Sequence, residues 1–295
     1  MTRAFLERLN AGEVLVADGA TGTNYQRMGI ALGVPPEEWV FDQPENVLTL
    51  HRAFVDAGSE IILTDSFGGT RLRMRDSKYA SRAPELNCRA AQLARQAAGE
   101  QILVAGSMGP TGLLMQPLGE LTHDAAAAAY AEQAAALVEG GVDFLLLETF
   151  FALDEALAAV EGVRRASQLP LVVSFSYDQG TRTMMGLRPS QVVEAIAPLG
   201  VAAIGANCGK SLDAMLQVTQ EMAAKKSGRP LWIKPNAGLP RMEGDVAQYD
   251  TSPETMAEYA LRFIDAGAQV VGGCCGNSPA HVKAIADAVK SHKPR

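Results

Sequence analysis

The sequence lacks the features that mark membrane, secreted and nucleic-acid-binding proteins. No apolar stretch approaches the ~20 residues that a helix needs to cross a bilayer. The segment Met1–Asn10 is charged where a signal peptide would have an apolar core. No Lys or Arg run exceeds the pair Lys225-Lys226, and the 295-residue chain has a formal net charge of −7, so it offers no phosphate-binding surface. We therefore expect a cytoplasmic protein.

Cysteine is also scarce, which excludes a disulfide scaffold. The four cysteines are Cys88, Cys208, Cys274 and Cys275. Two are adjacent, and adjacent cysteines rarely bond to each other because the geometry is strained. In a reducing compartment, metal binding, catalysis and core filling are the remaining uses. Cys88 falls in the middle of a predicted helix, and we interpret it as a packing residue.

What the sequence does contain is a regular alternation of short apolar runs and longer Ala-rich segments of helical character. The eight runs are Val14–Ala17, Glu60–Thr64, Ile102–Ala105, Asp143–Leu147, Leu171–Phe175, Ala202–Ala206, Leu231–Lys234 and Gln269–Gly272. The helical segments that follow them are Pro44–Ala57, Pro84–Ala98, His123–Glu139, Asp154–Ala166, Ser190–Pro198, Ser211–Lys226, Ser252–Ala266 and Ser278–Lys290. Because the runs are nearly all apolar, they are typical of parallel strands that are covered on both faces.

Eight strand–helix units predict an α/β fold, a single (β/α)8 TIM barrel that spans residues 1–295. A doubly wound sheet is the alternative, but no Gly-x-Gly-x-x-Gly fingerprint follows the first run. The longest irregular stretches are Asp65–Arg82, Met108–Thr122 and Asn236–Thr251. Each follows a predicted strand, so each is expected at the mouth of the barrel, where active sites lie.

Three of the cysteines stand at this mouth. Cys208 follows the sixth run, and Cys274 and Cys275 follow the eighth. The tips of strands six and eight lie close together in a barrel, and three converging thiolates can bind Zn²⁺ with a fourth position open, as in catalytic zinc sites. Adjacent side chains can share one metal only where the chain turns, which the flanking glycines allow. Buried core cysteines are the alternative.

The predicted chemistry is thiol alkylation. A zinc ion with three thiolate ligands carries a formal charge of −1, which makes it a poor centre for hydrolysis. It suits the binding of a substrate thiol instead, because a coordinated thiol is deprotonated. Such a thiolate attacks soft electrophiles such as methyl groups.

Other candidate residues also follow predicted strands. Asp18 and Glu148 are carboxylates that can hold a substrate ammonium, with a turn or cap role as the alternative for Asp18. The glycine-rich loop with Ser66 and Phe67 offers N–H groups that can bind a carboxylate, and tight-turn packing is equally compatible with it. Trp39 is either a platform for a cationic methyl donor or a buried anchor.

Together these residues resemble the homocysteine S-methyltransferase family. The matching motifs are Asp18–Thr23, Gly205–Gly209, Pro235–Pro240 and Gly272–Gly276, and the resemblance covers essentially the whole chain. It implies a homocysteine-binding barrel with Zn²⁺ that methylates homocysteine to methionine. It places the zinc thiolates on Cys208, Cys274 and Cys275, the homocysteine-binding acids on Asp18 and Glu148, and an approach to the zinc on Asn236. The further candidate substrate-binding residues are Ser66, Phe67, Asn207 and Trp39.

Within this family the sequence looks most like bacterial betaine–homocysteine methyltransferases, in which an aromatic residue at the position of Trp39 lines the betaine site. Glycine betaine is therefore the expected donor, although Thr149 replaces a Tyr of the animal enzymes and Lys210-Ser211 replaces a family Gly-Pro. S-methylmethionine, S-adenosylmethionine and a methyl-corrinoid partner protein are alternative donors. The predicted helices reach nearly to Arg295, so a corrinoid would come from a separate protein. The sequence is compatible with a homo-oligomer.

Two functions of other classes are also compatible with the sequence. A barrel lyase or aldolase would need an essential lysine, for which Lys234 is the candidate, and no stoichiometric metal. A non-catalytic thiol- or zinc-binding protein would bind homocysteine without turnover.

Overall fold

The computed structural model describes residues 2–243 and 246–292. Eight parallel strands form one sheet in the order β1-β10-β7-β6-β5-β4-β3-β2, and a parallel bridge between Ala17 and Ile61 joins the first and last strands into a ring. The strands are β1 (Leu15–Val16), β2 (Ile61–Leu63), β3 (Leu103–Met108), β4 (Phe144–Phe150), β5 (Leu171–Ser176), β6 (Ala203–Cys208), β7 (Leu231–Pro235) and β10 (Ala268–Val271). Each predicted run overlaps one of them, and the TIM barrel is confirmed.

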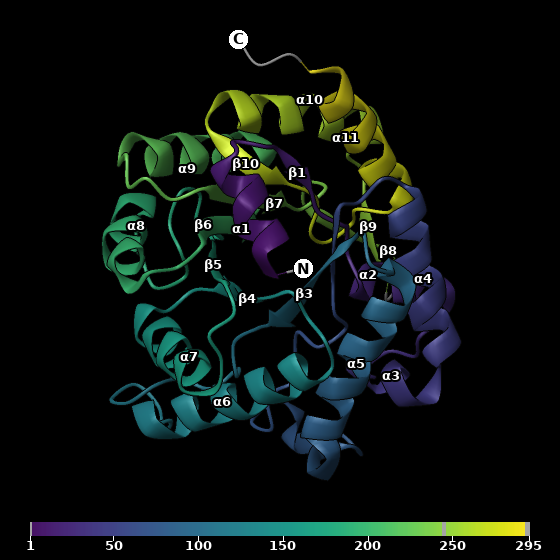
Figure 1. The fold of residues 1–295 in the computed structure, drawn as a ribbon, viewed down its shortest axis with the longest axis vertical. Coiled ribbons are helices and arrows are strands. Elements are labelled where there is room, and N and C mark those ends of the chain that lie inside the picture. Colours follow the sequence, from purple (N-terminus) through teal and green to yellow (C-terminus); the bar gives the residue numbers. More distant parts are fainter. Residues whose placement is uncertain (1, 244–245, 293–295) are drawn as a thin grey trace.

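Helices surround the ring, as Figure 1 shows. The eight expected helices are present, with ends within two residues of those predicted: α4 (Pro44–Asp56), α5 (Ala83–Ala98), α6 (His123–Glu139), α7 (Leu153–Ala166), α8 (Pro189–Ile196), α9 (Leu212–Ala224), α10 (Pro253–Asp265) and α11 (Pro279–Ser291). The hydroxyls of Thr122, Ser211 and Ser252 each accept a backbone N–H in the first turn of a helix. Such caps satisfy N–H groups that would otherwise lack partners, so these helices begin there.

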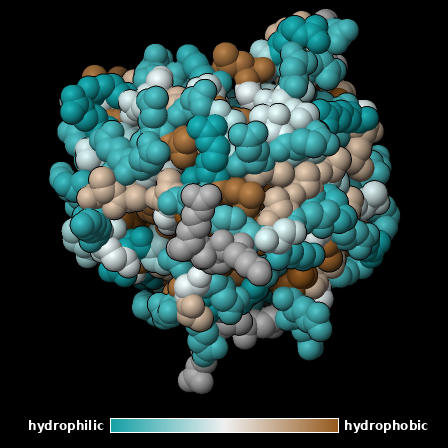
Figure 2. All heavy atoms as spheres, turned by 90° about the horizontal axis from the view of Figure 1, so that it is seen from above, coloured by the Kyte–Doolittle hydropathy of each residue, from teal (hydrophilic) through white to brown (hydrophobic). Residues whose placement is uncertain are grey.

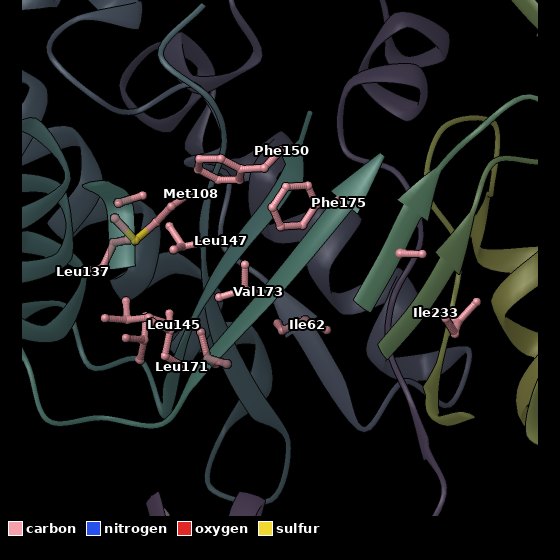
Figure 3. Close-up of a cluster of buried hydrophobic side chains, with 14 of the residues drawn as sticks. Ile62, Met108, Leu137, Leu145, Leu147, Phe150, Leu171, Val173, Phe175 and Ile233 are labelled. Carbon is pink, nitrogen blue, oxygen red and sulfur yellow. The ribbon is translucent and has the colours of Figure 1, made fainter. Parts of the chain in front are cut away.

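Side chains along each strand alternate between two cores. On β4, Phe144 and Leu146 belong to a cluster inside the barrel, whereas Leu145 and Leu147 pack outward against the helices. Figure 3 shows these two leucines together with Leu137 of α6. Both faces of the strand are therefore covered, which explains why the run is apolar throughout.

The N-terminal helix α1 (Thr2–Asn10) closes one end of the barrel. The ring of Phe5 stacks on the ring of Phe144 with centroids 3.9 Å apart, and Leu9 joins the same interior cluster. In Figure 1, α1 lies across the centre of the ring. Because Phe144 begins β4, the helix covers the N-terminal ends of the strands and leaves their C-terminal ends free for a site.

The long loops at the C-terminal ends contain elements that the sequence did not predict. These are α2 (Gly22–Met28), η1 (Pro36–Glu38) and α3 (Trp39–Asp42) after β1, η2 (Arg73–Asp76) and η3 (Ala80–Arg82) after β2, and an antiparallel hairpin of β8 (Pro240–Glu243) and β9 (Val246–Tyr249) after β7. One more short turn, η4 (Ala197–Leu199), follows α8. The loops after β1, β2 and β7 therefore build much of the barrel mouth.

The outer surface is mostly polar in the view of Figure 2, where hydrophobic residues form separate spots. In the part of the chain that the structure describes, no helix is both long and apolar enough to span a membrane.

Candidate functional site

Three cysteine side chains meet at the C-terminal ends of the strands. Cys208 is the last residue of β6, and Cys274 and Cys275 follow β10. The Sγ atoms of Cys208 and Cys274 are 3.0 Å apart, and all three Sγ atoms lie within 4.8 Å of one another. Within residues 2–243 and 246–292, this is the only such group of three His, Cys, Asp or Glu ligands. The spacing suits three sulfur ligands of one metal ion.

A tight turn brings the adjacent cysteines to the same point. The carbonyl of Cys274 accepts a hydrogen bond from the N–H of Asn277 at 3.1 Å, and Gly276 within the turn has a φ of +83°. A Cβ on Gly273 would lie 2.2 Å from Cγ of Asn277, so only glycine fits beside that amide. The turn that the flanking glycines predicted is therefore present.

The backbone beside the thiols is strained. Thr149 and Cys208 have φ values of 65° and 57°, a region that residues other than glycine rarely adopt. The side chain of Asn207 holds this arrangement: its Oδ1 accepts the N–H of Thr149 at 2.9 Å, and its Nδ2 donates to Oγ1 of Thr149 at 2.6 Å. The same Nδ2 lies 3.7 Å from Sγ of Cys208. Strain of this kind concentrates at functional sites.

A buried ion pair lies near the thiols. Nζ of Lys234 donates to Oδ1 of Asp18 at 2.7 Å, and the N–H of Leu63 donates to Oδ2 at 2.7 Å. Burial alone would lower the pKa of Lys234, but the charges of Asp18 and Glu148 raise it above its ordinary value. Lys234 is therefore protonated at neutral pH. A lysine that forms Schiff bases must be neutral when it attacks, so the aldolase alternative loses its nucleophile.

Glu148 presents its carboxyl group to the same region and accepts a hydrogen bond from the Ser107 hydroxyl. Burial raises the pKa of Glu148 to about 7.

The pKa of Glu148 in the folded protein exceeds its value in the unfolded chain, so the folded protein binds more protons at pH values between the two. We expect the free energy of unfolding to fall by roughly 3 kcal/mol as the pH rises from about 4.5 to about 7. Urea denaturation of the metal-free protein across this range measures the effect. The Glu148→Gln variant should lose this part of the pH dependence, and an equal fall in the variant would contradict the assignment.

The thiols and Glu148 line one cavity of about 850 Å³. A volume in this range accommodates a ligand of drug size, or two small substrates side by side. Loops after several strands contribute to its wall, including Thr21, Glu37, Asp65, Phe67, Arg73 and Thr111.

The structure brings only some of the predicted substrate residues to this cavity. Glu148 and Phe67 line it, but Asp18 and Ser66 do not. Asp18 already uses both carboxylate oxygens, and the buried Ser66 donates its hydroxyl to the carbonyl of Ser107. Asn207 is fully buried next to the thiols and does not form part of the cavity lining.

Trp39 and Asn236 both make their contacts with other parts of the protein. The ring of Trp39 is buried against the ring of Tyr25, with centroids 4.6 Å apart, and lies outside the cavity lining. Of the two alternatives for Trp39, a platform for a cationic donor and a buried anchor, its place in the structure matches the buried anchor. Asn236 links the two cysteine loops: its Nδ2 donates to the carbonyl of Gly209 at 2.9 Å, and its Oδ1 accepts the N–H of Cys275 at 3.0 Å.

Tyr249 is a site residue that the sequence did not reveal. It ends β9, and its ring covers Gly276, where a Cβ would lie 2.3 Å from Cγ of Tyr249. Burial and the neighbouring Cys275 raise the pKa of its hydroxyl. Its position in the stretch Asn236–Thr251 predicted proximity to the mouth, but no pattern distinguishes this side chain.

Fold and site together define a TIM-barrel protein with a three-cysteine cluster at the C-terminal ends of its strands. The sequence model of the homocysteine S-methyltransferase family matches residues 15–289. The chain belongs to this family, and the resemblance drawn from the motifs is confirmed.

Relatives and solved structures agree with this placement. Methionine synthases of Mycobacterium leprae and Mycobacterium tuberculosis are each 32% identical over 95% of this chain. The chain spans about a quarter of their length, 24% and 25% respectively. The metallated form of the homocysteine methyltransferase MmuM from Escherichia coli has a TM-score of 0.79 at 23% identity, covering 97% of this chain and 99% of that one. Its oxidized form has a TM-score of 0.76 at 25% identity, covering 92% and 94%. The barrel is common to all of these structures.

Proposed function

We propose that this protein transfers a methyl group from glycine betaine to the thiol of homocysteine, which yields methionine. The observation that carries the proposal is the group of three Sγ atoms within 4.8 Å of one another, on the wall of a cavity of about 850 Å³. In the reaction a sulfur–carbon bond forms as a nitrogen–carbon bond breaks. The electron pair of the broken bond goes to nitrogen, so dimethylglycine leaves with a neutral tertiary amine, which takes up the proton that the homocysteine thiol has lost.

The three cysteines fit a zinc ion. Their soft sulfur donors are close enough to share one metal, and they open onto a cavity from which a fourth ligand can come. Hydrogen bonds from Cys208 and Cys274 lower the pKa of the Cys275 thiol, whereas the hydrogen bonds of Cys208 with the other two cysteines raise its own pKa. Binding of a metal would therefore release protons from the cluster. Zinc bound there would keep the thiol of homocysteine ionised.

The residues around the cluster bind and orient the amino acid. Glu148 is a buried carboxylate on the cavity wall and is the group we assign to the homocysteine ammonium. Asp18 acts indirectly, because its charge is paired with Lys234. The amide of Asn207 points an N–H toward Cys208 and stabilises negative charge on sulfur. The transfer is favoured because it neutralises the positive charge of the donor. A site that excludes water strengthens the attraction between the thiolate and the donor cation.

An assay of methionine formation tests the proposal directly. Zinc-loaded protein with homocysteine and glycine betaine is expected to form methionine and dimethylglycine in equal amounts, measured by mass spectrometry. Methionine formed only from S-methylmethionine, S-adenosylmethionine or a methyl-corrinoid protein would contradict betaine as donor and retain the thiol chemistry. Homocysteine binding without turnover from any of these donors would identify a thiol-binding protein instead.

A further inference from the structure

Two buried acidic side chains face the cavity, and neither forms an ion pair within the described part of the chain. Glu37 in η1 and Asp65 after β2 are 5% and 3% exposed, and both line the cavity. Among the described residues, no Lys, Arg or His nitrogen lies within 4.0 Å of either carboxylate. Burying a carboxylate without a partner is costly. A bound cation would remove this cost.

Each carboxylate has one oxygen that accepts a hydrogen bond and one that accepts none from the residues that the structure describes. Oε1 of Glu37 accepts the N–H of Gly68 at 2.5 Å, and Oδ2 of Asp65 accepts the Tyr25 hydroxyl at 3.1 Å. A Cβ on Gly68 would lie 2.8 Å from Oε1 of Glu37, so glycine permits this approach. In the described ranges the other two oxygens, Oε2 and Oδ1, have no hydrogen-bond partner, yet neither is fully enclosed. They are therefore accessible from the cavity.

The electrostatics of this wall favour a positive ligand. Burial and the charge of Glu37 raise the pKa of Asp65 well above its usual range, because two buried negative charges side by side are unfavourable unless a proton or another cation binds there. Among the described residues, three cationic side chains line the same cavity, and each contacts another group. Lys234 pairs with Asp18, the guanidinium of Arg73 lies over the Phe67 ring at 5.7 Å, and that of Arg75 is 3.5 Å from an oxygen of Asp76. The acidic pair is thus left for a ligand.

We propose that Glu37 and Asp65 form the subsite that holds the positively charged group of the methyl donor, and that they select onium donors over compounds of the same shape that lack this positive group. This inference rests on the proposed function, since it requires that one cavity present the donor to the cysteine cluster. A quaternary ammonium group has no N–H and cannot donate a hydrogen bond, so the carboxylates attract it through its positive charge. The donor loses its charge as the methyl group leaves, so the pair contributes to donor binding rather than to the rate of transfer.

Calorimetric titration of the zinc-loaded protein tests the subsite without requiring turnover. The ligands are glycine betaine, tetramethylammonium and 3,3-dimethylbutanoate, in which carbon replaces the quaternary nitrogen of betaine. Wild-type protein is expected to bind betaine at least about tenfold more tightly than 3,3-dimethylbutanoate, whose tert-butyl group has the same shape but carries no charge. The double variant Glu37→Gln/Asp65→Asn keeps the shape of both side chains, and it is expected to lose betaine affinity by roughly 10- to 100-fold.

Glu38→Gln is the matched control. Glu38 is the next residue and is also buried, but it accepts the hydroxyl of Ser77 and lies outside the cavity lining. Its variant should bind betaine like the wild type. In steady-state assays the double variant should show a higher KM for the donor, with no fall in kcat and an unchanged KM for homocysteine. If circular dichroism shows that the double variant does not fold, the same titrations are made with the single variant Glu37→Gln, which should also bind betaine more weakly than the wild type.

The outcomes separate the subsite from the proposed reaction. Equal betaine affinity in the wild type and in a folded double variant overturns the subsite and leaves methyl transfer standing. A fall in kcat alone, or a wild type that binds neither betaine nor tetramethylammonium, also overturns it. If betaine affinity depends on the acidic pair but no donor yields methionine, the subsite stands and the proposed function fails.

Discussion

Cys274→Ala is expected to abolish zinc binding and methyl transfer together. Sγ of Cys274 lies 3.0 Å from Sγ of Cys208, so its removal leaves two sulfur ligands where a zinc site needs three from the protein. Loss of groups that only support metal ligands costs roughly 10- to 100-fold in metal affinity or activity, and loss of a ligand should cost more. Elemental analysis should show about one zinc per wild-type chain and almost none in the variant.

Cys88→Ala is the control for this experiment. Cys88 is a half-buried thiol in α5 and takes no part in the three-cysteine cluster. Its variant should keep both the metal and the activity of the wild type. A Cys274→Ala protein that forms methionine at the wild-type rate without bound zinc would refute the assignment of the cluster.

The barrel could be predicted because its strands are covered on both sides. Residues such as Leu145 and Leu146 face opposite layers, but both layers are apolar, so the run stands out from the helices around it. The hairpin of β8 and β9 could not be predicted in this way. The four residues of β8, Pro240–Glu243, are all exposed, and burial therefore imposes no apolar pattern on them.

The thiol cluster could also be predicted, since strand ends in a barrel meet at one mouth and cysteine has distinctive chemistry. The ion pair between Asp18 and Lys234 could not be predicted from the sequence. Asp18 and Lys234 are 216 residues apart, and their contact depends on how the closed ring orients each side chain. Asp18 therefore looked like a free carboxylate in the sequence. The two alternatives for Trp39 could not be separated for a related reason, because the sequence does not show which side of a loop faces the cavity and which side packs against Tyr25.

Lys234→Met is expected to destabilise the protein by about 3–5 kcal/mol, since removing one partner of a buried ion pair leaves the other charge uncompensated. Lys234 and Asp18 are both about 2% exposed, so water cannot replace the lost partner. Urea denaturation of the metal-free protein at neutral pH measures the change. Lys225→Met is the matched control: Lys225 pairs with Glu194 on the surface, where such a pair contributes at most about 1 kcal/mol.

The double variant Asp18→Asn/Lys234→Met decides whether the pair or the lysine alone matters. If Lys234 serves to neutralise Asp18, removing both charges should recover most of the lost stability, because a buried pair replaced as a whole is often nearly neutral. No recovery would show that Lys234 contributes through packing or through other charges such as Glu148. A borohydride-trapped adduct on wild-type Lys234 with a carbonyl substrate would contradict its protonated state and revive the lyase alternative. The ion pair at 2.7 Å predicts that no such adduct forms.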